Sequence, residues 1–587
     1  MAVYHVLGQT VSTTRWVCLI CCLSSLLIYV AVAKTPGYLS DMYNLANDEN
    51  EYIDLYTNAS YESTVNSLME EAAKYFDYIA DPDVPEDISQ STWDDAGGVV
   101  PWVDEETKLR NDITVKYSYS DAPNIVFALV DDWGWNDIGY QSTYLSFTTP
   151  HIDALAAEGI KLSNYYSAFL CTPARASFLT GRYPLRNSLY REYMGGELPL
   201  DEYTIAEEMQ SAGYRTYMVG KWHIGYSSVS RTPTYRGFDY FYGYYNGFID
   251  YYNKTYGDYL DLTENTDLVT DATELDSTYH SAILFQTKAE KILESHSESY
   301  ASQPFFLYYS LQLMHTEWAA DQIYIDRCKY EGSDSDLDTY CGMSLMLDEV
   351  IGNLTCALDR YGFSDNTILI VASDNGGTSV IKGSNYPLLG AKGSTHRGGV
   401  SVPAFIHSKL IPQSRRGGTY DDLVHVTDWL PSLMHVATNG EWTGSFGGSS
   451  VAIDGINVWD AIMDDEDSPR TSIIHVMDTT SNYSLLVDSY VLNYNCVKKN
   501  DHDVPTCTYD TDQNPNNSFL SCDVISLVDF SDTDSISDDF FGTIAAVNSN
   551  YRAVFVIAVI ICCIGPLLWF GYLKFKELHA IKRHKSG

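Results

Sequence analysis

Asn124-Ile-Val-Phe-Ala-Leu-Val130, which runs directly into Asp131-Asp132, is the stretch that decides how this chain folds. Its uncharged residues, rich in branched side chains, predict a strand that is buried on both faces. Three further stretches have the same character: 216–219, 305–310 and 367–372. Helical patterns fall between them, at 151–158, 204–212 and 343–358. Strands that alternate with helices predict an α/β domain built on a mostly parallel sheet flanked by helices.

Polar residues follow each of these strands. They are Asp131-Asp132, Lys221 and His223, His315, and Asp374-Asn375. Ligands of open α/β sheets bind outside the carboxyl ends of the strands, so we expect these side chains to share one site. Asp131, Asp132, Asp374 and Asn375 offer only oxygen, which suits a hard cation such as Ca²⁺ or Mg²⁺, and no zinc spacing is present. Without a cation the carboxylates would repel one another.

A cysteine introduces the most specific motif of the chain. Cys171-Thr172-Pro173-Ala174-Arg175 runs on into Leu179-Thr180-Gly181-Arg182. Proline suits the first position of a helix and glycine its end, so the run predicts a helix that begins near the thiol and stops at Gly181. The positive potential of a helix N-terminus favours anions and thiolates. A cysteine considered alone could equally be a disulfide or core residue, but the whole pattern argues against that.

This run resembles the sulfatase signature, in which Cys-x-Pro-x-Arg is followed after three residues by Leu-Thr-Gly-Arg. Six further stretches between about 124 and 470 are similar to sulfatases of the arylsulfatase B type and occur in the family's order: 130–137, 149–155, 219–225, 236–239, 373–377 and 427–431. The resemblance implies an alkaline-phosphatase-like fold. It also implies that a formylglycine-generating enzyme converts Cys171 to formylglycine (3-oxoalanine), whose hydrate is the nucleophile.

The resemblance further implies a role for each site residue. One Ca²⁺ would be held by Asp131, Asp132, Asp374, Asn375 and the modified Cys171. Arg175 and Lys221 would hold the hydrate, Asp374 would help to activate it, and His223 would deprotonate it to release sulfate. His315 and Lys392 would contact the sulfate and assist departure of the alcohol. The chain departs from the family at Ala174, where serine is usual, and at Thr316-Glu317, where relatives often have Glu-Pro.

Three functions remain open from the sequence. The first is a sulfatase that acts on sulfated carbohydrates or small sulfate esters. The second is a phosphonate or phosphodiester hydrolase of the same superfamily. The third is an adhesion or binding protein that has lost its chemistry, which would predict an eroded site, whereas every expected residue is present. The formal net charge of −42 excludes a nucleic-acid partner and favours a saline or acidic environment or a small substrate.

The ends of the chain predict a membrane protein. Residues 1–33 have the pattern of a signal peptide, with an uncleaved signal anchor as the alternative. The apolar run 553–573 is long enough for a transmembrane helix, and the basic tail 574–587 that follows it would stay in the cytoplasm, whereas a GPI signal would not carry such a tail. We therefore expect a single-pass type I membrane protein whose body is lumenal or extracellular.

Between these ends we expect three parts. Residues 34–120 carry 19 acidic against five basic residues and could be a partly ordered extension, a covering segment or a pro-region, with a possible helix at 70–79. Residues 121–444 would form the catalytic domain and residues 445–548 a smaller α+β domain. Six cysteines besides Cys171 could form three disulfides of unknown connectivity: Cys328, Cys341, Cys356, Cys496, Cys507 and Cys522. Glycosylation sequons begin at Asn58, Asn253, Asn353, Asn482 and Asn516.

Overall fold

The computed structural model describes residues 41–44, 64, 67–68, 90–101, 114–117, 121–190, 196–328, 335–378, 382–444, 452–477 and 482–495. All of them belong to one compact unit, Ser40–Asn517. The expected signal peptide, the transmembrane helix at 553–573, the basic tail and the possible helix at 70–79 lie outside the described residues.

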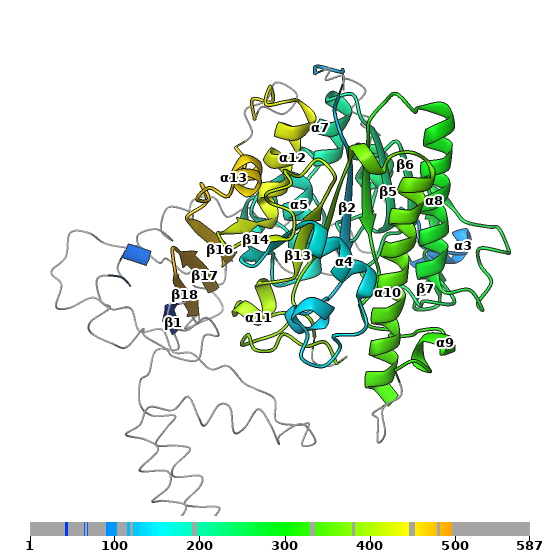
Figure 1. The fold of residues 1–587 in the computed structure, drawn as a ribbon. Helices are drawn as coiled ribbons and strands as arrows, with labels where there is room; N and C mark the ends of the chain where they lie inside the picture. The colour runs from blue at the N-terminus through cyan, green and yellow to red at the C-terminus, as the bar shows by residue number, and fades with distance from the viewer. Residues whose placement is uncertain are drawn as a thin grey trace, which may run out of the picture. The chain divides into compact units, whose positions relative to one another are not determined.

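A ten-stranded sheet runs through the middle of the molecule, in the order β10-β9-β6-β5-β11-β2-β12-β13-β3-β14 (Figure 1). Its central strands are all parallel: β6 (Tyr240–Tyr244), β5 (Arg215–Lys221), β11 (Phe305–Ser310), β2 (Asn124–Val130) and β12 (Thr367–Ser373). The four strands predicted from apolar runs are therefore confirmed. They are neighbours in space although long stretches of sequence separate them.

The two borders of the sheet contain antiparallel pairs. On one side β9 (Thr263–Glu264) pairs antiparallel with β6 and with β10 (Asp267–Leu268). On the other side β13 (Ala404–His407) pairs antiparallel with β12 and with β3 (Ile160–Leu162), while β14 (Gly418–Tyr420) lies parallel to β3. The sheet is therefore mixed and mostly parallel, as expected.

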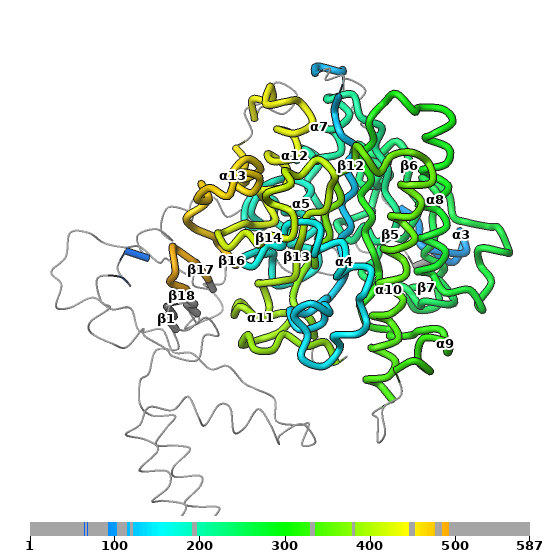
Figure 2. The backbone as a smooth tube through the Cα atoms, viewed as in Figure 1, coloured from blue at the N-terminus to red at the C-terminus, as the bar shows by residue number. Residues whose placement is uncertain are grey.

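Helices cover both faces of the sheet. The side chains of Ile125, Phe127 and Leu129 belong to a different core cluster from those of Val126, Ala128 and Val130, because successive residues of a strand point to opposite faces. The first cluster includes α5 (Cys171–Thr180), α7 (Ile205–Ser211) and α12 (Trp429–Ala437). The second includes α4 (Pro150–Glu158), α8 (Ser281–Ser299) and α10 (Ser335–Arg360), and α8 and α10 lie side by side in the tube view of Figure 2.

Helix α10 starts earlier than the predicted 343–358. Its first turns carry Ser335, Asp336 and Asp338, so no apolar periodicity marks them, although acidic residues suit a helix N-terminus. It is the one described helix long and apolar enough to cross a membrane by length and composition, but 78% of its most apolar window is buried inside the protein. Its hydrophobicity is therefore that of a core helix.

A second sheet forms towards the C-terminus. It has the order β1-β18-β17-β16, all antiparallel, and comprises β16 (Ser472–Met477), β17 (Asn482–Val487), β18 (Tyr490–Asn495) and β1 (Asp41–Asn44). Ile473, Leu486 and Val491 pack in one apolar cluster with Tyr166 and Val400 of the main body. The boundary at 444/445 stays a prediction.

Other described parts of the acidic N-terminal region also lie against the body. Helix α3 (Gln90–Ala96) contains Trp93, which is 4% exposed and stacks on Tyr226 with ring centroids 6.4 Å apart. Just beyond α3, the Val99 N–H donates to the Leu260 carbonyl over 2.7 Å. These parts of the region cover the body.

One disulfide is present among the described residues, between Cys328 and the α10 residue Cys341. Cys356, on the same helix, carries an exposed free thiol. Cys496, Cys507 and Cys522 lie outside the described residues.

Candidate functional site

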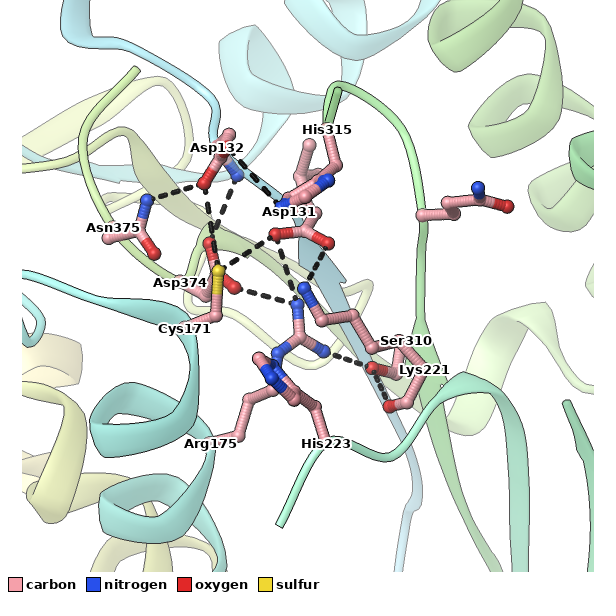
Figure 3. A network of polar contacts seen from close by, with 12 residues as sticks. Asp131, Asp132, Cys171, Arg175, Lys221, His223, Ser310, His315, Asp374 and Asn375 are labelled. Atoms are coloured by element: carbon pink, nitrogen blue, oxygen red, sulfur yellow. Dashed lines mark hydrogen bonds and ion pairs between the residues drawn. The ribbon is translucent and has the colours of Figure 1, made fainter. Parts of the chain in front are cut away.

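The carboxyl ends of the central strands bring the predicted residues together (Figure 3). Strand β2 leads into Asp131 and Asp132, and β12 leads into Asp374 and Asn375. The Asp132 N–H donates to Asp374 Oδ1 over 3.0 Å, and Asn375 Nδ2 donates to Asp132 Oδ1 over 2.7 Å. Asp132 has a positive φ of 57°, a left-handed conformation that breaks the alternation of the strand. Two consecutive carboxylates can therefore face the same site.

Helix α5 supplies the thiol. Cys171 and Arg175 lie one helical turn apart, so both side chains point from the same face. Cys171 Sγ lies 3.4 Å from Asp131 Oδ1 and 3.7 Å from Asp132 Oδ1, and it is not bridged to another described sulfur. Burial, and next the charge of Asp374, raise the pKa of the Cys171 thiol well above its usual range. A protonated thiol is a poor nucleophile.

The ends of α5 test two predictions. Gly181 ends the helix with a φ of 64°, which confirms the predicted stop. The helix begins at Cys171 itself, so Pro173 is its third residue and the predicted first position for proline is wrong. The third position is equally compatible with proline, because the N–H groups of the whole first turn have no partner within the helix.

Each of the three carboxylates contacts a cation, and Arg175 contacts Asp131 as well as Asp374. Lys221 Nζ lies 2.7 Å from Asp131 Oδ2, Arg175 Nη2 lies 2.6 Å from Asp374 Oδ2, and Lys392 Nζ lies 2.9 Å from Asp132 Oδ1. These acids, Arg175 and Lys221 are fully buried. Burial disfavours ionisation of Asp131, but the charges of Lys221 and Arg175 outweigh it and lower its pKa. The site thus combines buried negative charge with positive charge arranged around it.

Two histidines lie close to the first residues of α5, His315 near Cys171 and His223 near Thr172. His315 Nε2 lies 3.3 Å from Lys392 Nζ and 3.8 Å from Asp132 Oδ2, and His223 Nε2 lies 3.3 Å from the Thr172 hydroxyl. Burial, and next the charge of Lys221, lower the pKa of both rings well below the usual range. Both rings are therefore neutral at neutral pH in this arrangement and can exchange a proton with a bound molecule.

The carboxylate and amide oxygens of this site suit a hard cation. Ligand atoms of Asp131, Asp132, Cys171 and His315 all lie within 4.8 Å of one another. Asn375 Oδ1 is buried and has no hydrogen-bond partner among the described residues. Burial, and next the charge of Asp131, raise the pKa of Asp374, a cost that a bound cation would remove. His315 belongs to the geometric cluster although the sequence assigned it no ligand role.

The sequence missed two hydroxyl residues that position these groups. Ser310, the last residue of β11, accepts from Arg175 Nη1 over 2.5 Å and donates to the Lys221 carbonyl over 2.6 Å. Ser167 donates to the Asp374 carbonyl over 2.6 Å. The place of Ser310 at the end of a strand, paired with Leu129 and Gly220 just before Asp131 and Lys221, was the only signal that could have identified it.

Comparison with known proteins gives a consistent result. The family model described as Sulfatase matches residues 123–439. The chain is 37% identical to Arylsulfatase J of Mus musculus over 365 residues, 61% of this chain and 58% of that protein. It is 32% identical to N-acetylgalactosamine-6-sulfatase of Mus musculus over 303 residues, 48% of this chain and 56% of that protein. The chain therefore spans less than three fifths of the length of either relative. These matches do not specify the arylsulfatase B type.

Solved structures share the fold. Ps i-CgsB in complex with k-i-k-neocarrahexaose is 26% identical with a TM-score of 0.55, over 63% of this chain and 84% of the other. PsFucS1 sulfatase from Pseudoalteromonas sp. is 24% identical with a TM-score of 0.52, over 62% of this chain and 77% of the other. The second likeness concerns the fold alone.

Proposed function

Because the chain belongs to the sulfatase family, we propose that it is a sulfuric ester hydrolase that removes sulfate from sulfated carbohydrates or smaller sulfate monoesters. The observation that carries this proposal is the position of Cys171. Its Sγ lies within 3.7 Å of two buried carboxylates at the carboxyl ends of the parallel strands, and Arg175, Lys221 and Lys392 form ion pairs with the acids of this site. A sulfate monoester is an anion, and a buried site that combines cations with a metal-binding carboxylate cluster suits it.

We assign the catalytic roles to the chain's own residues as follows. Formylglycine at position 171 would supply a hydrated aldehyde as nucleophile. Arg175 and Lys221 would hold the oxygens at that position, and Asp374 would help to activate them. Lys392 and His315, whose Nζ and Nε2 lie 3.3 Å apart, would contact the sulfate and assist departure of the alcohol. His223 would accept a proton at Nε2 as sulfate leaves.

The same site would hold one Ca²⁺ through Asp131, Asp132, Asp374, Asn375 and the modified Cys171. Support comes from the all-oxygen set and from the unpartnered Asn375 Oδ1. The ion would compensate the buried carboxylates and bind a sulfate oxygen.

A sulfated carbohydrate is the favoured substrate class. The related solved protein Ps i-CgsB was crystallised with an oligosaccharide, k-i-k-neocarrahexaose, and the name of the relative N-acetylgalactosamine-6-sulfatase includes an amino sugar. The net charge of −42 would repel a long polyanion, so activity on such a polymer should rise with added salt.

We further propose that the body is lumenal or extracellular and is held by the apolar run 553–573 as a single-pass type I protein. The catalytic domain would span residues 121–444 and the smaller α+β domain residues 445–548. The Cys328–Cys341 disulfide supports an oxidising compartment, and the sequon residue Asn253 is exposed. A formylglycine-generating enzyme of that compartment would be the maturation partner.

The test is expression of the full chain in a secretory host that contains a formylglycine-generating enzyme. Mass spectrometry of the peptide with Cys171 should show the aldehyde in place of the thiol. The protein should turn over 4-nitrophenyl sulfate much faster than an aryl phosphodiester. Cys171→Ala should abolish turnover, whereas the matched control Cys356→Ala, at an exposed free thiol, should not. An active protein with an unmodified thiol would refute the mechanism.

A further inference from the structure

One loop lies directly against both histidines of the site. A Cβ added to Gly247 would come within 2.8 Å of His223 Nε2, so the backbone here packs on the His223 ring. The next residue, Phe248, stacks on His315 with ring centroids 5.8 Å apart and planes 16° apart. The loop therefore forms one boundary of the site, and no step of the proposed reaction uses it.

This boundary is apolar where the rest of the site is charged. Phe248 contacts the Tyr256 ring edge-on, with centroids 5.3 Å apart. Both rings are half-buried, so each keeps part of its surface accessible. Charged residues around Cys171 suit the sulfate of an ester, but they offer nothing to its organic part. An aromatic face beside His315 complements the C–H surface of a ring.

We propose that Phe248 and Tyr256, here called the aromatic wall, bind the ring that bears the sulfate and so determine which esters are accepted. The proposal rests on the sulfatase function proposed above. Because Phe248 stacks on His315, a ring held against the wall would present its ester oxygen beside the histidine assigned to assist departure of the alcohol. The ring could be an aryl group or the pyranose of a glycan, since both offer a flat apolar face.

The wall is supported by a segment outside the 123–439 sulfatase match. Tyr256 ends β7 (Thr255–Tyr256), which pairs with β8 (Tyr259–Leu260) as a hairpin. Trp93 contacts the Tyr259 ring edge-on at 5.4 Å, and the Tyr259 hydroxyl donates to Asp94 Oδ1 over 2.8 Å. The acidic N-terminal region thus holds the hairpin that carries half of the wall, which makes Trp93 a positioning residue.

The first experiment separates the ring from the sulfate. For the full-length enzyme, kcat and KM are measured with 4-nitrophenyl sulfate and with a sulfated monosaccharide, and inorganic sulfate is measured as an inhibitor. Phe248→Ala should raise KM for a ring ester about five- to tenfold, and Phe248→Tyr should remain near wild type. The inhibition constant of inorganic sulfate should stay within about twofold. The ester with the larger rise identifies the ring that the wall recognises.

Tyr300→Ala is the matched control. Tyr300 is 40% exposed and lies near the amino end of β11, away from the site. Its replacement by alanine should change neither KM for the ring esters nor the inhibition constant of inorganic sulfate. Equal effects of Phe248→Ala on both ring esters and on inorganic sulfate, or no effect on any, would overturn the proposal.

Trp93→Ala tests the support. It should raise KM for ring esters with kcat and sulfate inhibition unchanged, and Trp93→Phe should restore KM. A general loss of stability would instead lower the active fraction and kcat, with KM unchanged. If Trp93→Ala lowered kcat and left KM unchanged, Trp93 would not be a positioning residue.

Binding to the inactive Cys171→Ala protein distinguishes this proposal from the proposed function. Calorimetry with 4-nitrophenyl sulfate should show weaker binding when Phe248→Ala is added, with unchanged binding of inorganic sulfate. If the wild type turned over no sulfate ester but still bound the ring through Phe248, the proposed function would fail and the aromatic wall would stand. If Phe248 did not affect ring binding, the wall would fail whatever the activity.

Discussion

Asn375 and Asp132 share a hydrogen bond of 2.7 Å that fixes the orientation of the Asn375 amide. Nδ2 donates to Asp132 Oδ1 and to the Gly376 carbonyl, and Oδ1 is left buried without a hydrogen-bond partner among the described residues. A buried acceptor without a partner costs about 1–3 kcal/mol. A cation bound at this oxygen would remove that cost.

Removal of calcium should therefore destabilise the protein and inactivate it. A chelator should lower Tm and abolish turnover, and added Ca²⁺ should restore both, because a ligand that binds only the folded state stabilises it by about 2.7 kcal/mol at a hundred times its Kd. Mg²⁺ should restore less, since it demands a tighter octahedral geometry. A Tm that is indifferent to chelation would argue against the metal site.

Substitution of Asn375 should act through the same ion. Asn375→Ala removes the unpartnered oxygen and should weaken Ca²⁺ binding at least tenfold, measured from the calcium dependence of Tm. Asn366→Ala is the comparison, because Asn366 is at the opposite end of β12, where its Nδ2 donates to the Ala122 carbonyl. The two variants should differ in calcium dependence even if their stabilities without calcium are similar.

Gly220 should not tolerate a side chain. A Cβ there would lie 1.9 Å from the Ser310 carbonyl oxygen, and the residue has a φ of +107°. Gly220→Ala would push β5 away from β11 and shift Lys221, so we expect a loss of more than about 4 kcal/mol in the free energy of unfolding, or no folded protein. Gly257 has a φ of +58°, but an added Cβ would meet open space there. Gly257→Ala should therefore lower the free energy of unfolding by about 1 kcal/mol. Urea denaturation of both variants checks this, and similar costs would contradict it.

Asp137 should make the protein less stable as the pH rises. Burial raises its pKa to about 6, against the hydrogen bonds from Tyr144, Tyr340, Ser384 and Gly134. A carboxyl whose pKa is raised on folding binds its proton more tightly in the folded state. Its contribution is therefore full below pH ~4 and is lost as the pH rises through about 6, by on the order of 3 kcal/mol.

The test of that sign is the slope of the free energy of unfolding between pH 4 and 6. Asp137→Asn should be less stable overall, because an amide nitrogen cannot accept hydrogen bonds. Its free energy of unfolding should, however, fall less, or rise more, between pH 4 and 6 than that of the wild type. Asp365→Asn replaces an acid whose side chain is 87% exposed and should keep the wild-type slope. If the free energy of unfolding of Asp137→Asn fell more over this range than that of the wild type, the predicted sign would be wrong.

The sequence predicted the features that arise from local patterns. The apolar runs at β2, β5, β11 and β12 marked the core strands, and the polar residues after them marked the site, because parallel strands end at a common edge. Contacts between distant segments left no such pattern. Nothing in the sequence near Trp93 indicates that it contacts the hairpin of β7 and β8. Nothing near Phe248 indicates that it contacts Tyr256 of that hairpin. The first turns of α10 were missed because polar residues hide helical periodicity.

The pairing of β1 with β18 has a consequence for the order of assembly. A ribosome releases β1 early, but the strand that completes its hydrogen bonds emerges only after nearly all the described chain has been made. Until then the polar backbone of β1 can bond only to water, a chaperone or a neighbouring nascent chain. Closure of this small sheet therefore requires that synthesis has passed β18, and a polypeptide that stopped before it would leave the backbone of β1 without this partner strand.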